Sequence, residues 1–223
     1  VIMQKTPGAA EEYLVYDNKG RPVMAQDGNM RADSPAKWLV TLYDKYDRPV
    51  QTGLWNNAND LAYHTAQANN ATSDYPFSES TIPGSGYERL TRTGYDRYGS
   101  LPSGTGLTAS FDNTYTSNSN YFYTTYNVSP DYAQPITATN QTRGLVTWTE
   151  TKVLNSSPAV YLYSVHFYDD NGRLIQAKKN NITGGVDIIT TQHSWAGQTL
   201  RVLEKLEVPG SPAQVSLVLT MLQ

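Results

Sequence analysis

Pairs of carboxylates are the residues of this sequence whose spacing is best suited to catalysis. The pairs are Asp44 with Asp47, Asp169 with Asp170, and Glu11 with Glu12. Two carboxylates that flank a glycosidic bond form the catalytic machinery of most glycoside hydrolases. Each pair, however, lies in or near a predicted turn, where aspartate accepts hydrogen bonds from backbone N–H groups. We therefore interpret these residues as structural and predict no catalytic residue.

The histidines and the glycine-rich segments offer no better candidates for chemistry. His64, His166 and His193 lack the spacing of metal ligands, and the chain contains no cysteine. Segments 83–86 and 103–106 are rich in glycine, but no helical pattern follows either of them to supply a phosphate-binding N-terminus. The sequence predicts no metal and no cofactor.

A group of aromatic residues between positions 115 and 126 is the remaining candidate for binding. Exposed tyrosines with neighbouring Asn and Thr side chains can hold a glycan, and the same rings can instead cover one face of a sheet. Both interpretations stay open. The candidate glycan-binding residues are Tyr121, Tyr123 and Tyr126.

Composition limits the classes of partner and of fold. The 223-residue chain has a net charge of −3, which provides no basic field for nucleic acid. It contains no apolar run of the roughly 18 residues that a transmembrane helix needs. Charged residues make up 17% and tyrosine occurs 17 times, a balance that favours strands and turns. We expect an all-β protein with no nucleic-acid partner and no membrane span.

A seven-residue sequence recurs along the chain and predicts the turns and strands that position the candidate residues. It reads YDNKGRP from Tyr16, YDKYDRP from Tyr43, YDRYGSL from Tyr95 and YDDNGRL from Tyr168. Aspartate suits the first position of a type I turn, and glycine three residues later accepts positive φ. This combination is the three-residue hairpin loop closed by a glycine bulge. A degenerate fifth copy places Trp195 and Gly197 at a turn.

The predicted turn residues share these positions in the five copies. They are Tyr16, Asp17, Gly20, Arg21, Tyr43, Asp44, Asp47, Arg48, Tyr95, Asp96, Gly99, Tyr168, Asp169, Gly172, Arg173, Trp195 and Gly197. In the second copy Asp47 stands in place of the glycine, which makes the left-handed backbone more costly. An ion pair between the aspartate and the arginine of each motif would fix the register of the hairpin.

Alternating apolar residues on both sides of the motifs predict hairpin arms. We expect hairpins near 11–27, 37–52, 87–101, 158–180 and 186–206, with insertions near 53–86 and 100–143. Pro22 and Pro49 predict bulged or edge return strands. The first insertion contains one helical pattern, at 59–68, and the second predicts long loops around one or two short strands near 120–126. The whole chain then forms a single segment of consecutive hairpins.

The motif Tyr-Asp-x-x-Gly-Arg-Leu, together with further blocks of the sequence, resembles the Rhs or YD-repeat proteins. These blocks include Lys5-Thr6-Pro7-Gly8-Ala9, Arg143-Gly144-Leu145-Val146-Thr147 and Asn181-Ile182-Thr183-Gly184-Gly185. The version that the chain resembles occurs in very large secreted proteins of Bacteroidetes-type bacteria. The resemblance implies a spiral of hairpins that forms a hollow shell around a C-terminal, often toxic, polypeptide. Asp47, Ser100 and His193-Ser194 depart from the family's pattern.

The resemblance leads to an expected function without an enzymatic activity. We expect an internal fragment that forms part of the curved, open β-shell of a secreted or surface-exposed bacterial protein of the polymorphic-toxin type. Its partners would be the adjoining repeats and an encapsulated C-terminal toxin domain, and its open edges would favour a homodimer. The alternative is a carbohydrate-binding or adhesive module that recognises a cell-surface glycan.

Overall fold

The computed structural model describes residues 2–4, 7–8 and 10–219 of the chain. It divides into two compact units, residues 1–92 and 93–223. The hydrogen-bonded order of the described strands is the order of the sequence, from β1 to β12. The strands from β1 to β6 and those from β7 to β12 pair with their neighbours in antiparallel fashion. The predicted fold class, an all-β chain of consecutive antiparallel hairpins in one open sheet, is therefore confirmed.

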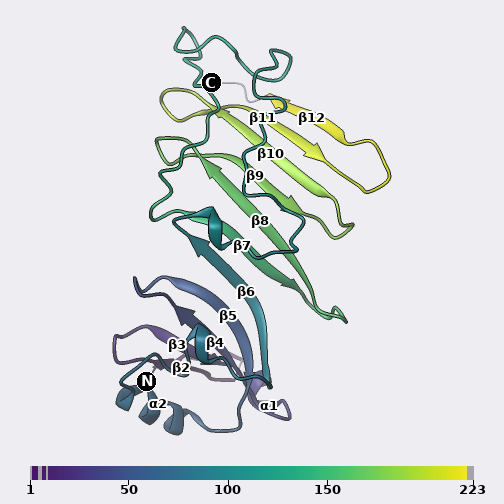
Figure 1. Cartoon of the computed structure of the whole chain (residues 1–223). Helices are drawn as coiled ribbons and strands as arrows, with labels where there is room; N and C mark the ends of the chain where they lie inside the picture. The colour runs from purple at the N-terminus through teal and green to yellow at the C-terminus, as the bar shows by residue number, and fades with distance from the viewer. Residues whose placement is uncertain (1, 5–6, 9, 220–223) are drawn as a thin grey trace. The chain divides into compact units, whose positions relative to one another are not determined.

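The first unit consists of hairpins and one covering helix (Figure 1). Its strands are β1 Ile2–Gln4, β2 Glu12–Tyr16, β3 Pro22–Gln26, β4 Lys37–Tyr43, β5 Pro49–Asn56 and β6 Tyr87–Tyr95, which ends in the second unit. Its helices are α1 Gly28–Ala32, α2 Leu61–Asn70 and the short 3-10 helix η1 Glu79–Thr81. Burial alternates along β4, where Trp38, Val40 and Leu42 are buried, as the strand pattern predicts.

Helix α2 covers a sheet face of the first unit and is the helix predicted near 59–68. It begins one residue after Asp60, whose carboxylate accepts a hydrogen bond from the N–H of Tyr63 at 2.8 Å. Asp60 is therefore the N-cap of the helix. The buried side chains of the helix are His64 and Ala68. The His64 ring packs edge-on against Trp38 of β4 with centroids 4.9 Å apart.

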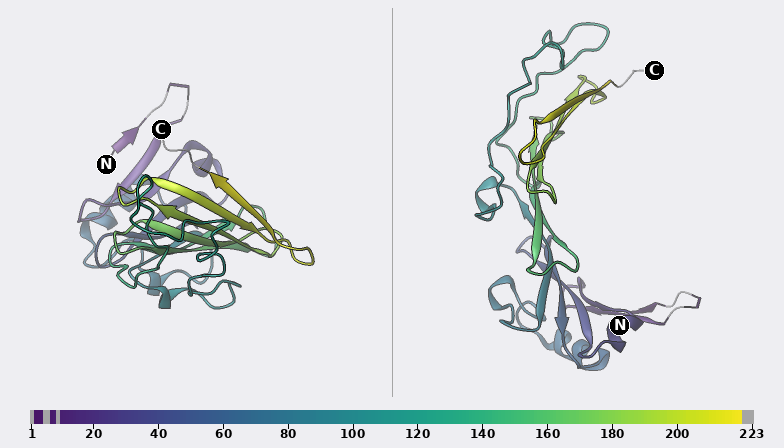
Figure 2. Two further views of the ribbon diagram at one scale, coloured as in Figure 1. Left: turned by 90° about the horizontal axis from the view of Figure 1, so that it is seen from above. Right: turned by 90° about the vertical axis from the view of Figure 1, so that its right-hand side faces the viewer.

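The second unit is a meander of strands with one long insertion. Its strands are β7 Val146–Val153, β8 Val160–Tyr168, β9 Leu174–Asn180, β10 Val186–His193, β11 Thr199–Leu206 and β12 Gln214–Leu219, and it also contains the 3-10 helix η2 Tyr98–Ser100. Figure 2 shows the chain from β6 to β7 running along one face of this sheet. The hydrophobic core lies between them and consists of Phe122, Ile136, Trp148, Val165, Phe167, Ile175 and Leu203.

Two sequence predictions for this insertion are wrong. Residues 120–126 form turns and irregular structure where short strands were expected. The tight hairpin expected near 87–101 is not formed, because β6 pairs onward with β7 only after the chain has passed through the insertion. Phe122 of this segment lies in the core and is 1% exposed, and the half-buried Tyr121 packs against the same cluster.

The hairpins carry a bulge beside each repeated turn. The register shifts between Val15 and Tyr16, between Leu42 and Tyr43, and between Phe167 and Tyr168. Tyr16 and Tyr43 lie opposite Pro22 and Pro49 at these shifts. The return strands are therefore bulged, which is one of the two outcomes that the prolines predicted. A proline is tolerated there because the bulge interrupts the ladder of hydrogen bonds. Among the described residues, no helix is long and apolar enough to cross a bilayer.

Candidate functional site

The aspartates of three repeated turns make the same hydrogen bonds. In each, Oδ1 accepts from the N–H groups two and four residues later, at distances of 2.8 to 3.0 Å. The donors are Lys19 and Arg21 to Asp17, Tyr46 and Arg48 to Asp44, and Asn171 and Arg173 to Asp169. The backbone completes each turn: the N–H of the residue three positions on donates to the aspartate carbonyl. The aspartate thus satisfies the backbone of the loop.

The second carboxylate oxygen of each turn accepts from the arginine four residues later. The distances from Nε to Oδ2 are 2.7 Å for Arg21 and Asp17, 2.9 Å for Arg48 and Asp44, and 2.6 Å for Arg173 and Asp169. The ion pairs expected from the sequence are therefore present. We call this arrangement of two backbone donors and one guanidinium on a single carboxylate the Asp–Arg clamp.

The Asp–Arg clamp keeps its carboxylate ionised in the first unit. Burial raises the pKa of Asp17, but hydrogen bonds from the N–H and side chain of Arg21 and the N–H of Lys19 outweigh it and lower the pKa below its usual value. The pKa of Asp44 is lowered in the same way by Arg48 and Tyr46, against the opposing effect of burial. A carboxylate held at both oxygens is a poor general acid and a poor nucleophile.

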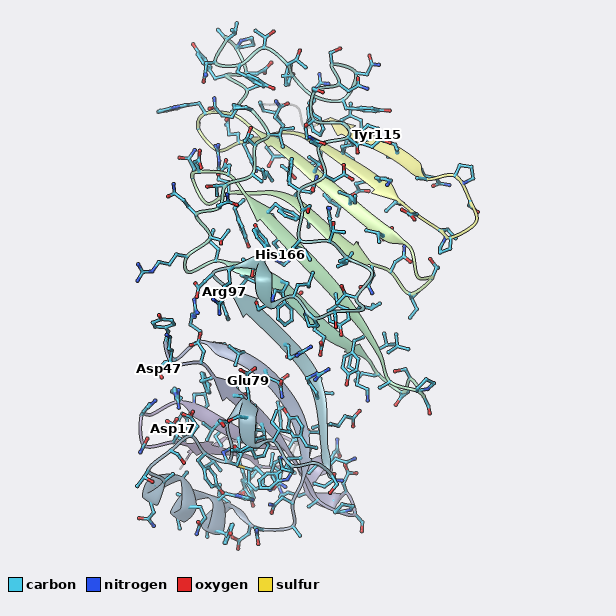
Figure 3. All side chains as sticks on the ribbon, in the orientation of Figure 1. Asp17, Asp47, Glu79, Arg97, Tyr115 and His166 are labelled. Atoms are coloured by element: carbon cyan, nitrogen blue, oxygen red, sulfur yellow. The ribbon has the colours of Figure 1, made fainter. Side chains whose placement is uncertain are left out.

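The arginine of a clamp also reaches the turn of another hairpin. Arg21 donates from Nη1 to Oδ1 of Asp47, 2.7 Å away in the turn between β4 and β5. Figure 3 shows Asp17 and Asp47 on the same side of the first unit. Arg173 likewise donates from Nη1 to the carbonyl oxygen of Ser194 at 2.8 Å. The motif therefore ties separate hairpins together at the turn end of the sheet.

The third copy of the motif, which starts at Tyr95, is opened by the second insertion. Asp96 has a φ of 69°, and its N–H donates to the carbonyl of Leu145 at 3.0 Å. The N–H of Gly144 donates to Oδ1 of Asp96 at 2.7 Å. Tyr95 ends β6, and Gly99 lies in η2. Asp96 thus closes the two ends of a long insertion where its counterparts close a three-residue loop.

The fifth copy and a further turn close with the same backbone hydrogen bonds. Gly197 N–H donates to the Ser194 carbonyl at 3.0 Å, and Gly184 N–H donates to the Asn181 carbonyl at 3.0 Å. Both glycines have positive φ. Oδ1 of Asn181 accepts from the N–H groups of Thr183 and Gly185, each at 3.1 Å, as the aspartates do. Asn181 was not predicted as a turn residue, although Asn three positions before Gly was the available signal.

The predicted glycan-binding tyrosines are not equivalent. Tyr121 is half-buried and its ring packs edge-on against Tyr115, with centroids 5.4 Å apart. Tyr123 is half-buried under the guanidinium of Arg201, which lies 4.3 Å from the ring centroid. Tyr126 is 37% exposed. Figure 3 places Tyr115 in the insertion that covers the second unit. Two of the three rings therefore pack within the protein.

Two buried glutamines that sequence reasoning missed attach this insertion to the sheet. Oε1 of Gln176 accepts from the N–H of Asp112, and its Nε2 donates to the Asp112 carbonyl, both at 2.8 Å. Oε1 and Nε2 of Gln192 bind the N–H and carbonyl of Tyr123 in the same way, both at 2.9 Å. A side-chain amide offers the donor and acceptor that a neighbouring strand would offer. The insertion is thus held without strands of its own.

The three histidines lie apart in different elements. His64 is fully buried in α2, and its Nδ1 is 2.6 Å from the hydroxyl oxygen of Tyr75. Burial lowers the pKa of His64 to about 4, although nearby Asp60 acts in the opposite direction. His166 lies on β8, and Nε2 of His193 on β10 is 3.1 Å from the carbonyl of Leu174. The described residues contain no group of three or more His, Cys, Asp or Glu arranged to hold a metal.

Comparison with known proteins adds no relative to these observations: no family model matches the chain, and no curated protein matches its sequence.

Proposed function

We propose that this chain is a non-enzymatic structural segment of the β-shell of a secreted or surface-exposed bacterial protein of the Rhs, polymorphic-toxin type. The single observation that carries the proposal is the Asp–Arg clamp, which recurs with the same hydrogen bonds at Asp17, Asp44 and Asp169. Repetition of one structural unit along a chain is the mark of a repeat architecture. Asp44, Asp47 and Asp169, which looked suited to catalysis, build turns, and Glu12 lies in strand β2.

The hydrogen bonds between hairpins support the same conclusion. Arg21 and Arg173 each reach a turn that lies more than twenty residues further along the chain. These contacts stiffen the turn end of an array in which each hairpin otherwise pairs only with its neighbours. A stiff array suits a wall, whose purpose is to keep its shape and to enclose another polypeptide.

A structure of the full-length protein that contains this sequence, determined by electron microscopy, tests the proposal. We expect the outer edge of β12 to pair with a further strand of the same sheet, and the sheet to enclose a cavity. A full-length protein in which this segment forms a separate domain that encloses nothing would overturn the proposal.

A further inference from the structure

We propose that the pocket between the Tyr132 loop and the Trp195 turn binds a neutral pyranose sugar. The pocket has a volume of about 430 Å³ and lies in the second unit. Its lining residues are Asn127, Pro130, Asp131, Tyr132, Ser194, Trp195, Ala196 and Gln198. That volume lies in the range of about 300 to 1,000 Å³ that small-molecule sites occupy. Sugar binding at this pocket would be separate from the structural role, because the side chains of Tyr132 and Trp195 take no part in an Asp–Arg clamp.

The walls of the pocket are fixed to each other by backbone hydrogen bonds. The N–H of Trp195 donates to the Tyr132 carbonyl at 2.8 Å, and the N–H of Gln134 donates to the His193 carbonyl at 2.9 Å. Tyr132 has a φ of 45°, which is unusual for a bulky residue, and its N–H donates to the Val128 carbonyl at 2.9 Å. The two aromatic side chains are therefore presented by a preformed frame, which reduces the entropy lost on binding.

Trp195 occupies a position where the turn itself requires no large side chain. The turn is closed by Ser194 and Gly197, and Trp195 takes the place that the polar residues Asn18, Lys45 and Asp170 take in other copies. Its side chain is 75% exposed, and Tyr132 is 49% exposed. Neither ring contacts another ring in the described part of the chain. Aromatic faces exposed beside a pocket suit stacking against the C–H face of a pyranose.

Polar groups beside these rings match the hydroxyl groups of a sugar. The Asp131 carboxylate and the Gln198 side-chain amide line the pocket, and neither makes a hydrogen bond or ion pair within the described residues. A carboxylate can accept from adjacent hydroxyls, and an amide can both donate and accept. Asp131 is also the one charged side chain among the lining residues given for this pocket. The nearby Arg173 is neutralised by Asp169 at 2.6 Å, so the pocket favours neutral over anionic sugars.

The exposure of the tryptophans provides a direct assay. Trp38 and Trp148 are 0% and 5% exposed, Trp55 is half-buried, and Trp195 is 75% exposed, so acrylamide quenches mainly Trp195. The probes are the methyl pyranosides of glucose, galactose, mannose and N-acetylglucosamine, with sialic acid and choline as charged comparisons. We expect at least one neutral sugar to protect Trp195 from quenching, with a Kd in the roughly millimolar range for so small a ligand.

Variants then locate the site by saturation-transfer NMR, which does not need the tryptophan signal. Trp195→Ala should weaken sugar binding about tenfold or more, and Trp195→Phe should retain part of it. Tyr46→Ala is the matched control, because Tyr46 is an exposed aromatic residue at a turn of the first unit. This variant should bind the sugar as the wild type does. A glycan array carrying protein-type N-glycans and bacterial polysaccharides would identify the source of the sugar.

Three results would overturn the proposal. They are protection by no neutral sugar, equal binding by Trp195→Ala and the wild type, and protection by choline or sialic acid alone. Choline binding alone would indicate a cation site formed by the aromatic rings and Asp131. None of these results would affect the proposed structural role, which the full-length structure tests separately.

Discussion

Arg21 donates from Nη1 to Oδ1 of Asp47 at 2.7 Å, so the turn between β2 and β3 is ion-paired to the turn between β4 and β5. Asp47 is the residue that stands where the motif usually has glycine, and its φ is 62°. The substitution therefore gives up an easy backbone conformation and places a carboxylate within reach of the preceding clamp. The departure from the motif has a structural role.

A double-mutant cycle with Arg21→Met and Asp47→Asn measures this contact. Asn tolerates the left-handed backbone, so the Asp47 change tests charge more than conformation. We expect a coupling free energy of about 0.5 to 1 kcal/mol from urea unfolding, falling as salt is added, because Asp47 is partly exposed. The Lys19 and Asp47 pair, 3.7 Å apart with both side chains more than half exposed, is the control and should show almost no coupling. Equal coupling for both pairs would refute a specific ion pair between Arg21 and Asp47.

The glycine of the fourth motif has a conformational role that a second experiment tests. Gly172 has a φ of 73°, and no neighbouring atom would touch an added Cβ. Gly172→Val should lower the free energy of unfolding by about 1 to 3 kcal/mol through backbone strain alone. Asn171→Val, at the exposed neighbouring position, should have a small effect. If the two valine variants unfold at the same urea concentration, the assigned turn geometry is incorrect.

The glutamines that hold the second insertion can be separated by hydrogen exchange. Gln176→Leu should speed amide exchange at Asp112, and Gln192→Leu should speed it at Tyr123, because each change removes the oxygen that accepts from that N–H. Loss of one such buried hydrogen bond typically costs about 1 kcal/mol, or several-fold in exchange rate. Each variant serves as the control for the other. Uniform acceleration at both amides would show that the insertion is not held at separate points.

The sequence predicted the repeated hairpins well because each turn depends on a few adjacent residues. Asp169 and Gly172 have local geometric requirements, and the alternation along β4 and β8 follows from the period of a strand. The helix in the first insertion was also visible, since its polar cap and its buried face lie within ten residues.

The second insertion was not predictable in the same way. Its structure depends on partners far away in the sequence: Gln176 binds Asp112, 64 positions distant, and Gln192 binds Tyr123, 69 positions distant. The hairpin expected after Tyr95 failed for a related reason, because the partners of Asp96 are Gly144 and Leu145. Trp195 was assigned only to a turn, since the pocket beside it exists only after the loop at Tyr132 has docked.

Acid should weaken the first unit through His64. The folded pKa of this buried histidine is lowered to about 4 from 6.5, so the folded state resists a proton that the unfolded chain accepts. Its contribution to stability is complete above about pH 6.5 and is lost as the pH falls toward about 4, by at most about 3 kcal/mol. His64→Gln should reduce the slope of the free energy of unfolding against pH between about pH 6.5 and about 4. When unfolding of the whole chain is followed, part of the slope should remain, because burial also lowers the pKa of His166 in the second unit, against a backbone hydrogen bond that raises it. An unchanged slope would contradict the assignment.

The central claim is that the first aspartate of the motif builds the hairpin. The free energies of unfolding of Asp169→Ala and Asp170→Ala test this claim most directly. Asp169 accepts two backbone N–H groups and a guanidinium, whereas Asp170 is exposed at the tip of the turn. We predict a loss of about 2 kcal/mol for Asp169→Ala and less than about 0.5 kcal/mol for Asp170→Ala. Equal losses, or no loss for Asp169→Ala, would contradict the account.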